Sequence, residues 1–252
     1  MSSKTVLITG ATSGIGKATS YKLALSKMQL IICGRRKKEL NKIEAELSKL
    51  TSVTSLCFDV SDNEQVIKSI ESIPADFQQI DVLINNAGNA HGLSQIQTGD
   101  LADWDAMIDI NVKGLLYVTK AVLPSMLDRD SGHIINIGSL AAKDVYANGT
   151  VYCASKKAVD AITEGMRKDL HETGIKVGAV HPGLVETNFS IVRFKGDEDK
   201  ASTVYKGYDP LQAQDIAEIV DFVVSRPAHV NITDLLVLPS AQASSTQVKK
   251  NL

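Results

Sequence analysis

Short apolar runs alternate along the chain with longer segments whose apolar residues recur at helical spacing. The runs are continuous rather than alternating, which is typical of strands covered on both faces. The predicted strands span 4–9, 29–33, 53–58, 81–84, 132–138, 175–180 and 233–238. The segments between them predict helices at 14–27, 36–50, 62–72, 101–127, 150–171 and 213–225.

This alternation of strands and helices predicts an α/β fold. Right-handed crossovers would build a doubly wound parallel sheet of about seven strands with helices on both faces. No internal repeat or linker separates a second domain, and 252 residues with 44% hydrophobic content can bury one large core. We therefore expect one domain over residues 1–252.

Two polar stretches interrupt the pattern, at 91–99 and 187–208. Both follow strands at the carboxyl edge of the predicted sheet, where ligands bind in such folds. We expect 187–208 to be a charged, irregular lid over a substrate. Residues 240–252 are rich in Ser, Gln and Lys, and we expect a loose polar tail or a subunit contact there.

Charge and composition exclude several classes of partner. The net charge is −2 and the pI is near 6.2, so no basic field favours nucleic acid or an anionic membrane. No apolar run reaches the ~20 residues of a membrane span, and the residues before the first strand are too few for a signal peptide. The three scattered cysteines indicate reduced thiols in the cytoplasm. None of the five histidines has metal-ligand spacing, so we expect no metal, and His181 is expected to end a strand.

A glycine turn joins the first predicted strand to the first helix. Its sequence, Gly10-Ala-Thr12-Ser13-Gly14-Ile15-Gly16, lets the backbone turn tightly and approach a phosphate without Cβ atoms in the way. The following helix would direct N–H groups and its positive end at that phosphate. The turn therefore predicts a Rossmann-like nucleotide site.

Two arginines, Arg35 and Arg36, follow the second strand, and no acidic residue occurs before Glu39. Guanidiniums suit the 2′-phosphate of NADP through bidentate, charge-assisted bonds. Cations are unfavourable at a helix N-terminus unless an anion pairs with them. This pattern predicts NADP as the cofactor, against the alternative of a solvated basic helix start.

Tyr152 and Lys156 stand four residues apart in a predicted helix, which puts both side chains on one face. A fixed ammonium close to a phenol lowers the phenol pKa by roughly 1–3 units from its usual value of ~10. Such a pair could transfer a proton near neutral pH, as the interconversion of a carbonyl and an alcohol requires.

The ordered series of these motifs resembles the short-chain dehydrogenase/reductase family. The resemblance runs from residue 4 to about residue 240. It includes the glycine turn, Asn85-Asn86-Ala87-Gly88, Asn111, Ser139, the Tyr152/Lys156 pair and Pro182-Gly183. It implies further cofactor contacts at Asp59, Val60, Asn86, Ala87, Gly88, Tyr152, Lys156, Pro182, Gly183, Val185 and Thr187. In this family the long helices at 101–127 and 150–171 pair across subunits, which implies a homotetramer.

The same resemblance implies the catalytic roles. Ser139 would bind the substrate oxygen, and Tyr152 would be the acid in reduction and the base in oxidation. Lys156 would lower the pKa of Tyr152 and bind the nicotinamide ribose, and Asn111 would hold a water that links Lys156 to solvent. Structural alternatives are a helix-interior kink at Asn111 and a strand-end cap at Ser139.

The segment from Leu184 to Asp197 resembles one branch of the family, the NADP-dependent 3-hydroxy acid dehydrogenases. The resemblance implies hydride transfer between NADP(H) and the β-hydroxyl or β-carbonyl of small acids such as serine, allo-threonine and 3-hydroxyisobutyrate. Such substrates need a cation, for which we nominate Arg193, with Lys143 as a weaker candidate. Alternatively, Arg193 pairs with Asp197 or Glu198 on the lid surface. Two other functions stay open: a broad NADPH carbonyl reductase acting on neutral ketones, aldehydes or dicarbonyls, and an NADP sensor without turnover.

Overall fold

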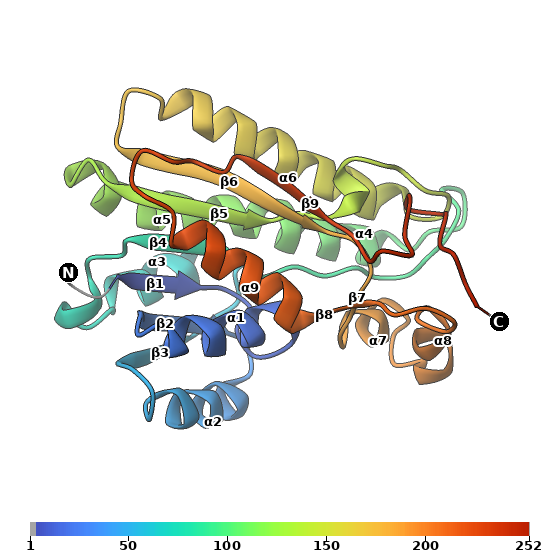
Figure 1. Ribbon diagram of the computed structural model, residues 1–252, viewed down its shortest axis with the longest axis horizontal. Helices are drawn as coiled ribbons and strands as arrows, with labels where there is room; N and C mark the ends of the chain where they lie inside the picture. Colours follow the sequence, from blue (N-terminus) through green and yellow to red (C-terminus); the bar gives the residue numbers. More distant parts are fainter. Residues whose placement is uncertain (1–3, 252) are drawn as a thin grey trace.

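The computed structural model describes residues 4–251, in which seven parallel strands form one sheet (Figure 1). The strands are Thr5–Ile8 (β1), Gln29–Gly34 (β2), Val53–Cys57 (β3), Val82–Asn85 (β4), Gly132–Ile137 (β5), Ile175–Pro182 (β6) and Asp234–Val237 (β9). Their order is β3-β2-β1-β4-β5-β6-β9. The chain therefore winds outward in both directions from β1 and β4, whose carboxyl ends form the switch point where such sheets bind ligands. The predicted fold class is confirmed.

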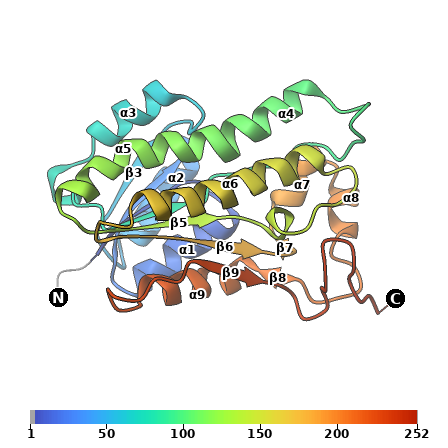
Figure 2. The same cartoon turned by 90° about the horizontal axis from the view of Figure 1, so that it is seen from above.

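Helices cover both faces of the sheet, as Figure 2 shows. One layer contains Gly14–Leu25 (α1), Lys37–Leu47 (α2) and Ala213–Val224 (α9). The opposite layer contains Asn63–Glu71 (α3), Leu101–Ile108 (α4), Leu115–Asp128 (α5) and Thr150–Asp169 (α6). Short 3-10 turns lie at Ala75–Phe77 (η1) and Leu140–Ala142 (η3).

Each central strand contributes side chains to two hydrophobic cores. In β1, Val6 and Ile8 pack into the core that includes residues of α1, α2 and α9. Leu7 points to the other face and packs with residues of α3 and α5. Successive strand residues face opposite sides of a sheet, so a strand covered twice must be apolar at every position. This explains the continuous apolar runs in the sequence.

The predicted helix over 101–127 is present but contains a π-helical turn, Asp109–Gly114 (η2), between α4 and α5. Asn111 lies in this turn and is 2% exposed. Gly114 ends the turn against Val60, because a Cβ at Gly114 would lie 2.8 Å from the Val60 Cγ2 atom. π-turns interrupt helices mostly at functional sites, and this one brings Asn111 toward the end of β4.

The segments expected to be irregular or loose have defined structure. Two short helices, Phe189–Arg193 (α7) and Glu198–Thr203 (α8), form the 187–208 segment, and Val185–Glu186 (β7) pairs with Leu211–Gln212 (β8) at its base. Figure 1 shows α7 and α8 beyond the carboxyl ends of the strands. In the 240–251 stretch, Gln242 is 6% exposed and accepts a hydrogen bond from the Leu184 N–H. This part of the chain packs against the body rather than trailing from it.

None of the helices formed by residues 4–251 combines the length and apolar character that crossing a membrane takes. Cys33, Cys57 and Cys153 are all unpaired.

Candidate active site

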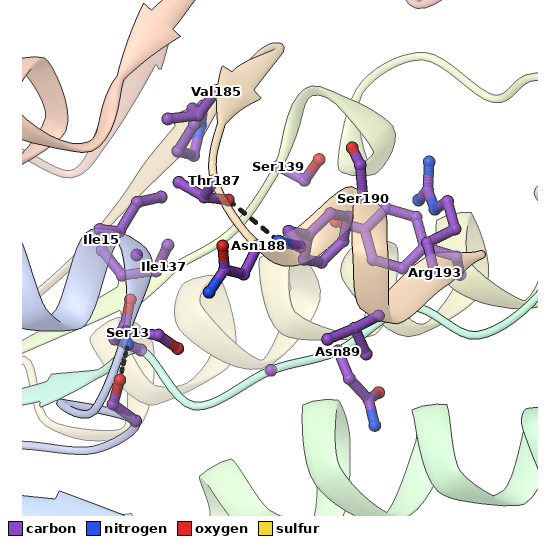
Figure 3. Close-up of a pocket in the computed structure, with 18 of the residues that line it drawn as sticks. Ser13, Ile15, Asn89, Ile137, Ser139, Val185, Thr187, Asn188, Ser190 and Arg193 are labelled. Atoms are coloured by element: carbon purple, nitrogen blue, oxygen red, sulfur yellow. Dashed lines mark hydrogen bonds between the residues drawn. The ribbon is translucent and has the colours of Figure 1, made fainter. Parts of the chain in front are cut away.

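A cavity of about 740 Å³ opens at the carboxyl ends of the central strands. Figure 3 shows the glycine turn, with Ser13 and Ile15, at one end of this cavity and Ser190 and Arg193 of α7 at the other. The site residues expected from the sequence line the cavity, with three exceptions: Gly16, Asn111 and the weaker candidate Lys143.

The glycine turn is shaped to hold an anion. Gly10 and Gly14 have φ angles of 67° and 52°, which side chains rarely adopt. A Cβ at Gly16 would lie 2.3 Å from the Asn86 side-chain nitrogen, which itself bonds to the Thr9 carbonyl oxygen at 2.8 Å. Ser13 makes no side-chain cap bond and the first turn of α1 carries no acidic residue. The N–H groups at this helix end are therefore available to a phosphate.

The two predicted cofactor arginines differ in their surroundings. Arg36 lies across the glycine turn and donates to the Thr12 hydroxyl from Nε at 3.3 Å and Nη2 at 2.8 Å. Arg35 pairs instead with Asp59 at 3.1 Å, and its side chain is 62% exposed. Arg36 is therefore the better placed of the two for an anion bound beside the turn.

Tyr152 lies on α6 and is 8% exposed. Burial raises the pKa of its phenol above the usual range, while the charge of Arg193 and a hydrogen bond with Ser139 oppose that rise. The Arg193 guanidinium carbon lies 4.7 Å from the centre of the Tyr152 ring. Arg193 thus acts on the phenol directly, an effect that the sequence predicts for Lys156 alone.

Lys156 is 6% exposed, and its ammonium donates to the Ile137 carbonyl oxygen at 3.0 Å. Burial lowers the pKa of Lys156 to about 8. Gly88 makes room for Asn111, because a Cβ at Gly88 would lie 3.1 Å from Asn111 Oδ1, and the same Cβ would be in ordinary contact with the Lys156 ammonium at 3.4 Å. Lys156 and Asn111 therefore flank the same short piece of backbone after β4.

Asn111 ties three segments together. Its Oδ1 accepts from the Asn89 N–H at 2.8 Å, and its Nδ2 donates to the Asn89 carbonyl at 2.9 Å and to the Ser155 hydroxyl at 3.0 Å. These bonds link the π-turn to the segment after β4 and to α6. The expected link through water to Lys156 stays a prediction.

Arg193 turns inward rather than pairing on the lid surface. Its Nη2 donates to the Tyr146 hydroxyl at 2.9 Å, and its guanidinium lies 5.1 Å from the centre of the Phe189 ring. Asp197, its expected alternative partner, instead pairs with Lys200 at 3.1 Å. The Arg193 Nε is buried and has no hydrogen-bond partner among residues 4–251.

Sequence reasoning missed several residues that surround Arg193 in the cavity wall. They lie outside the predicted strands and helices or at their ends, where no periodicity marks a buried side chain. These residues are Asn89, Tyr146, Phe189, Ser190 and Tyr205.

Lys143 does not line this cavity. Its ammonium binds the carboxylates of Asp160, at 2.8 Å, and Asp234. Together with His181, these acids offer ligand atoms within 4.8 Å of one another, the geometry of a cation site. The Lys143 ammonium already supplies a positive charge to both carboxylates. Lys143 is therefore a structural cation and a poor candidate for binding substrate.

Comparisons with known proteins identify the family of this chain. The family model for the short chain dehydrogenase matches residues 4–198. An NADP-dependent 3-hydroxy acid dehydrogenase of Schizosaccharomyces pombe is 44% identical over 248 residues, which are 97% of this chain and 96% of that protein. Sulfoacetaldehyde reductase 2 of Chromohalobacter salexigens is 43% identical over 95% of this chain and 96% of its own length. The closed form of serine dehydrogenase complexed with NADP+ superposes with a TM-score of 0.92 and 40% identity, covering 98% of this chain and 100% of that one.

The chain belongs to the short-chain dehydrogenase/reductase family. It is an NADP-dependent oxidoreductase that acts on a CH–OH group. This classification sets aside the alternative of an NADP-binding sensor that catalyses no reaction.

Removing the buried ammonium with Lys156→Met should stabilise the cofactor-free protein at pH 7 while abolishing turnover. The folded-state pKa of about 8 lies below the usual 10.5, so folding disfavours the charged amine. This penalty is complete below pH 8 and disappears as the pH rises from 8 to 10.5. We expect a gain of about 1–2 kcal/mol in the free energy of unfolding at pH 7, partly offset by the unpaired Ile137 carbonyl.

Thermal unfolding of both proteins between pH 6.5 and 10 measures this gain. Lys157→Met is the matched control, because the side chain of Lys157 is 65% exposed. Two results would contradict a lowered pKa of Lys156. One is a Lys156→Met variant with a lower unfolding temperature than the wild type at pH 7, and the other is a stability difference that does not change with pH.

Proposed function

We propose that this enzyme oxidises the β-hydroxyl of small 3-hydroxy acids, such as serine, allo-threonine and 3-hydroxyisobutyrate, with NADP+. The reverse reaction reduces the matching semialdehydes or β-keto acids. The observation that supports this choice is the half-buried guanidinium of Arg193 beside the ring of Tyr152.

Arg193 suits an anionic substrate because part of its hydrogen-bonding capacity is unused. One Nη2 bond goes to Tyr146, and Nε is buried without a partner among the described residues. A buried donor without an acceptor costs about 1–3 kcal/mol, and a carboxylate can accept two parallel bonds from a guanidinium. A bound carboxylate would therefore satisfy the Nε–H and also balance the charge.

The spacing of the two groups fits a β-substituted acid. In a 3-hydroxy acid, two bonds separate the carboxylate carbon from the carbon that is oxidised. The guanidinium carbon of Arg193 lies 4.7 Å from the centre of the ring that carries the Tyr152 hydroxyl, so the two groups border the same part of the cavity. An anion held by Arg193 would thus bring the β-carbon to Tyr152 and Ser139.

The chain supplies positioning and proton transfer. Ser139 would hold the substrate oxygen beside the Tyr152 phenol oxygen, which accepts the proton as the phenolate in oxidation and donates it as the phenol in reduction. Lys156 and Arg193 contribute the positive charge that favours the phenolate. When bound, NADP(H) supplies the hydride chemistry, and the glycine turn, Arg36 and the residues after β4 and β6 would hold it.

A sulfonate is the second anionic candidate. Sulfoacetaldehyde reductase 2 is named for a substrate whose sulfonate sulfur also lies two bonds from the reacting carbon. The same guanidinium could bind either anion. A neutral-carbonyl reductase is the contrasting alternative, since it would not need Arg193 as an anion site. An NADP-linked screen of serine, threonine diastereomers, 3-hydroxy acids, sulfoacetaldehyde and neutral ketones separates the three.

We also propose a cytoplasmic homotetramer. Exposed apolar side chains on α4 and α5, Leu101 at 68% and Leu116 at 40% exposure, support subunit contacts through these helices. Sedimentation of the purified enzyme tests the subunit number.

Replacing Arg193 with Ala should raise KM at least tenfold for a carboxylate substrate and much less for a neutral ketone. The expected loss is that of one charge-assisted hydrogen bond, about 1.5–3 kcal/mol. Lys195→Ala is the matched control, because Lys195 lies on the same lid and pairs outside the cavity with Asp103 at 2.9 Å. Steady-state kinetics with both substrate classes measures the two KM values. An equal rise in KM for the carboxylate and for the neutral ketone would show that Arg193 does not recognise the anion.

Cofactor choice should depend on Arg36 more than on Arg35. Arg36→Ala should weaken NADP(H) binding by roughly 10–100-fold through loss of charge-assisted bonds, and leave NAD(H) binding unchanged. Arg35→Ala should have a smaller effect, since Asp59 already pairs with that side chain. Lys38→Ala, on the exposed first turn of α2, controls for net charge. Titration with NADPH and NADH measures all four proteins, and equal losses for both cofactors would refute the 2′-phosphate role.

A further inference from the structure

His181 is a buried histidine directly behind the catalytic serine. It lies near the end of β6, beside the end of β5, and none of its side chain is exposed. A Cβ at Gly138 would lie 2.2 Å from the His181 Nδ1 atom. A glycine at 138 is therefore what allows the imidazole to occupy this position beneath the chain that leads into Ser139.

The His181 imidazole accepts a hydrogen bond from the backbone of Ser139. The Ser139 N–H donates to His181 Nδ1 at 3.3 Å. Because Nδ1 accepts, the ring proton of the neutral imidazole must be on Nε2. Burial lowers the pKa of His181 and the charge of Lys143 adds to this, so the ring is neutral at pH 7.

The opposite nitrogen faces two carboxylates. His181 Nε2 lies 3.5 Å from an oxygen of Asp160 and 3.5 Å from an oxygen of Asp234. These contacts are too long for strong hydrogen bonds, but the negative charges attract the Nε2–H and so orient the ring. The Lys143 ammonium, which binds both acids, offsets one of their two negative charges.

This cluster joins the elements that carry the catalytic side chains. Asp160 lies on α6, eight residues after Tyr152, and Asp234 begins β9. Lys143 directly follows the short turn η3. Ser139 caps the start of this turn, because the Ser139 Oγ accepts a hydrogen bond from the Ala141 N–H at 3.1 Å. Any shift of the imidazole would therefore move the Ser139 peptide relative to α6.

We propose that His181 is a positioning residue, whose Nδ1 fixes the Ser139 peptide so that the Ser139 hydroxyl stays directed at the Tyr152 phenol and the substrate oxygen. This inference rests on the proposed role of Ser139 and Tyr152. It assigns no proton transfer to His181, whose ring does not line the cavity.

Two amide variants separate the functions of the two ring nitrogens. In His181→Asn the side-chain oxygen can replace Nδ1 as acceptor, whereas in His181→Gln the amide reaches toward the Nε2 position. With the substrate that the wild type turns over fastest, we expect His181→Asn to keep kcat within about threefold of the wild type. His181→Gln should lower kcat about tenfold, as expected for one misplaced hydrogen bond, without changing the Kd for NADPH.

A double-mutant cycle with Ser139→Ala distinguishes positioning from a general structural effect. If His181 acts through Ser139, adding His181→Gln to Ser139→Ala should lower kcat no further. Multiplicative losses, or equal kcat values for the Asn and Gln variants, would overturn the proposal. His133→Gln, at a buried histidine near the start of β5, is the control for loss of a buried imidazole. If His181→Gln does not fold, as judged by thermal unfolding, His181→Ala takes its place in the same cycle.

The outcomes for His181 and for the substrate class are independent. The kinetic comparison uses whichever carbonyl or alcohol the enzyme prefers, so a preference for neutral ketones would refute the 3-hydroxy acid proposal and leave the His181 test intact. Normal kcat in His181→Gln would refute the positioning proposal alone.

Discussion

The burial of two titratable side chains on one face of α6 is the constraint on which the site depends. Withdrawal from water favours the neutral form of each group, so it raises the pKa of Tyr152 and lowers the pKa of Lys156 to about 8. Without ligands, the Tyr152 phenol therefore stays protonated and can act as an acid. Its use as a base requires nearby positive charge, which in this structure comes most directly from Arg193.

The rest of the fold keeps these groups in register with the cofactor cradle. The parallel sheet brings the glycine turn, the end of β4 and the end of β5 to one edge. Close approaches at three glycines then position polar side chains: Asn111 beside Gly88, Asn86 beside Gly16, and His181 beside Gly138. In each case a missing Cβ on one segment makes room for a polar side chain of another, which links local glycine placement directly to the geometry of the site.

The sequence was sufficient to predict every strand of the main sheet, because strands follow from local periodicity. Ordered motifs predicted a set of cofactor-binding residues, and all of these except Gly16 line the cavity. The sequence could not predict the π-turn at Asn111, since a helical pattern continues through it, nor the packing of Arg193 among Tyr146, Tyr152 and Phe189. That packing joins two segments that are distant in the chain, 146–152 and 189–193. Lys143 was misjudged for the same reason: its partners Asp160 and Asp234 are brought to it only by tertiary structure.

The central claim is that the buried Tyr152 hydroxyl transfers the proton. Turnover and NADPH affinity of a Tyr152→Phe variant test it most directly, because only the hydroxyl is removed. We expect NADPH to bind within about threefold of the wild-type Kd, while kcat falls by roughly 10²–10⁴-fold, the usual contribution of general acid–base catalysis. A kcat equal to that of the wild type would contradict it.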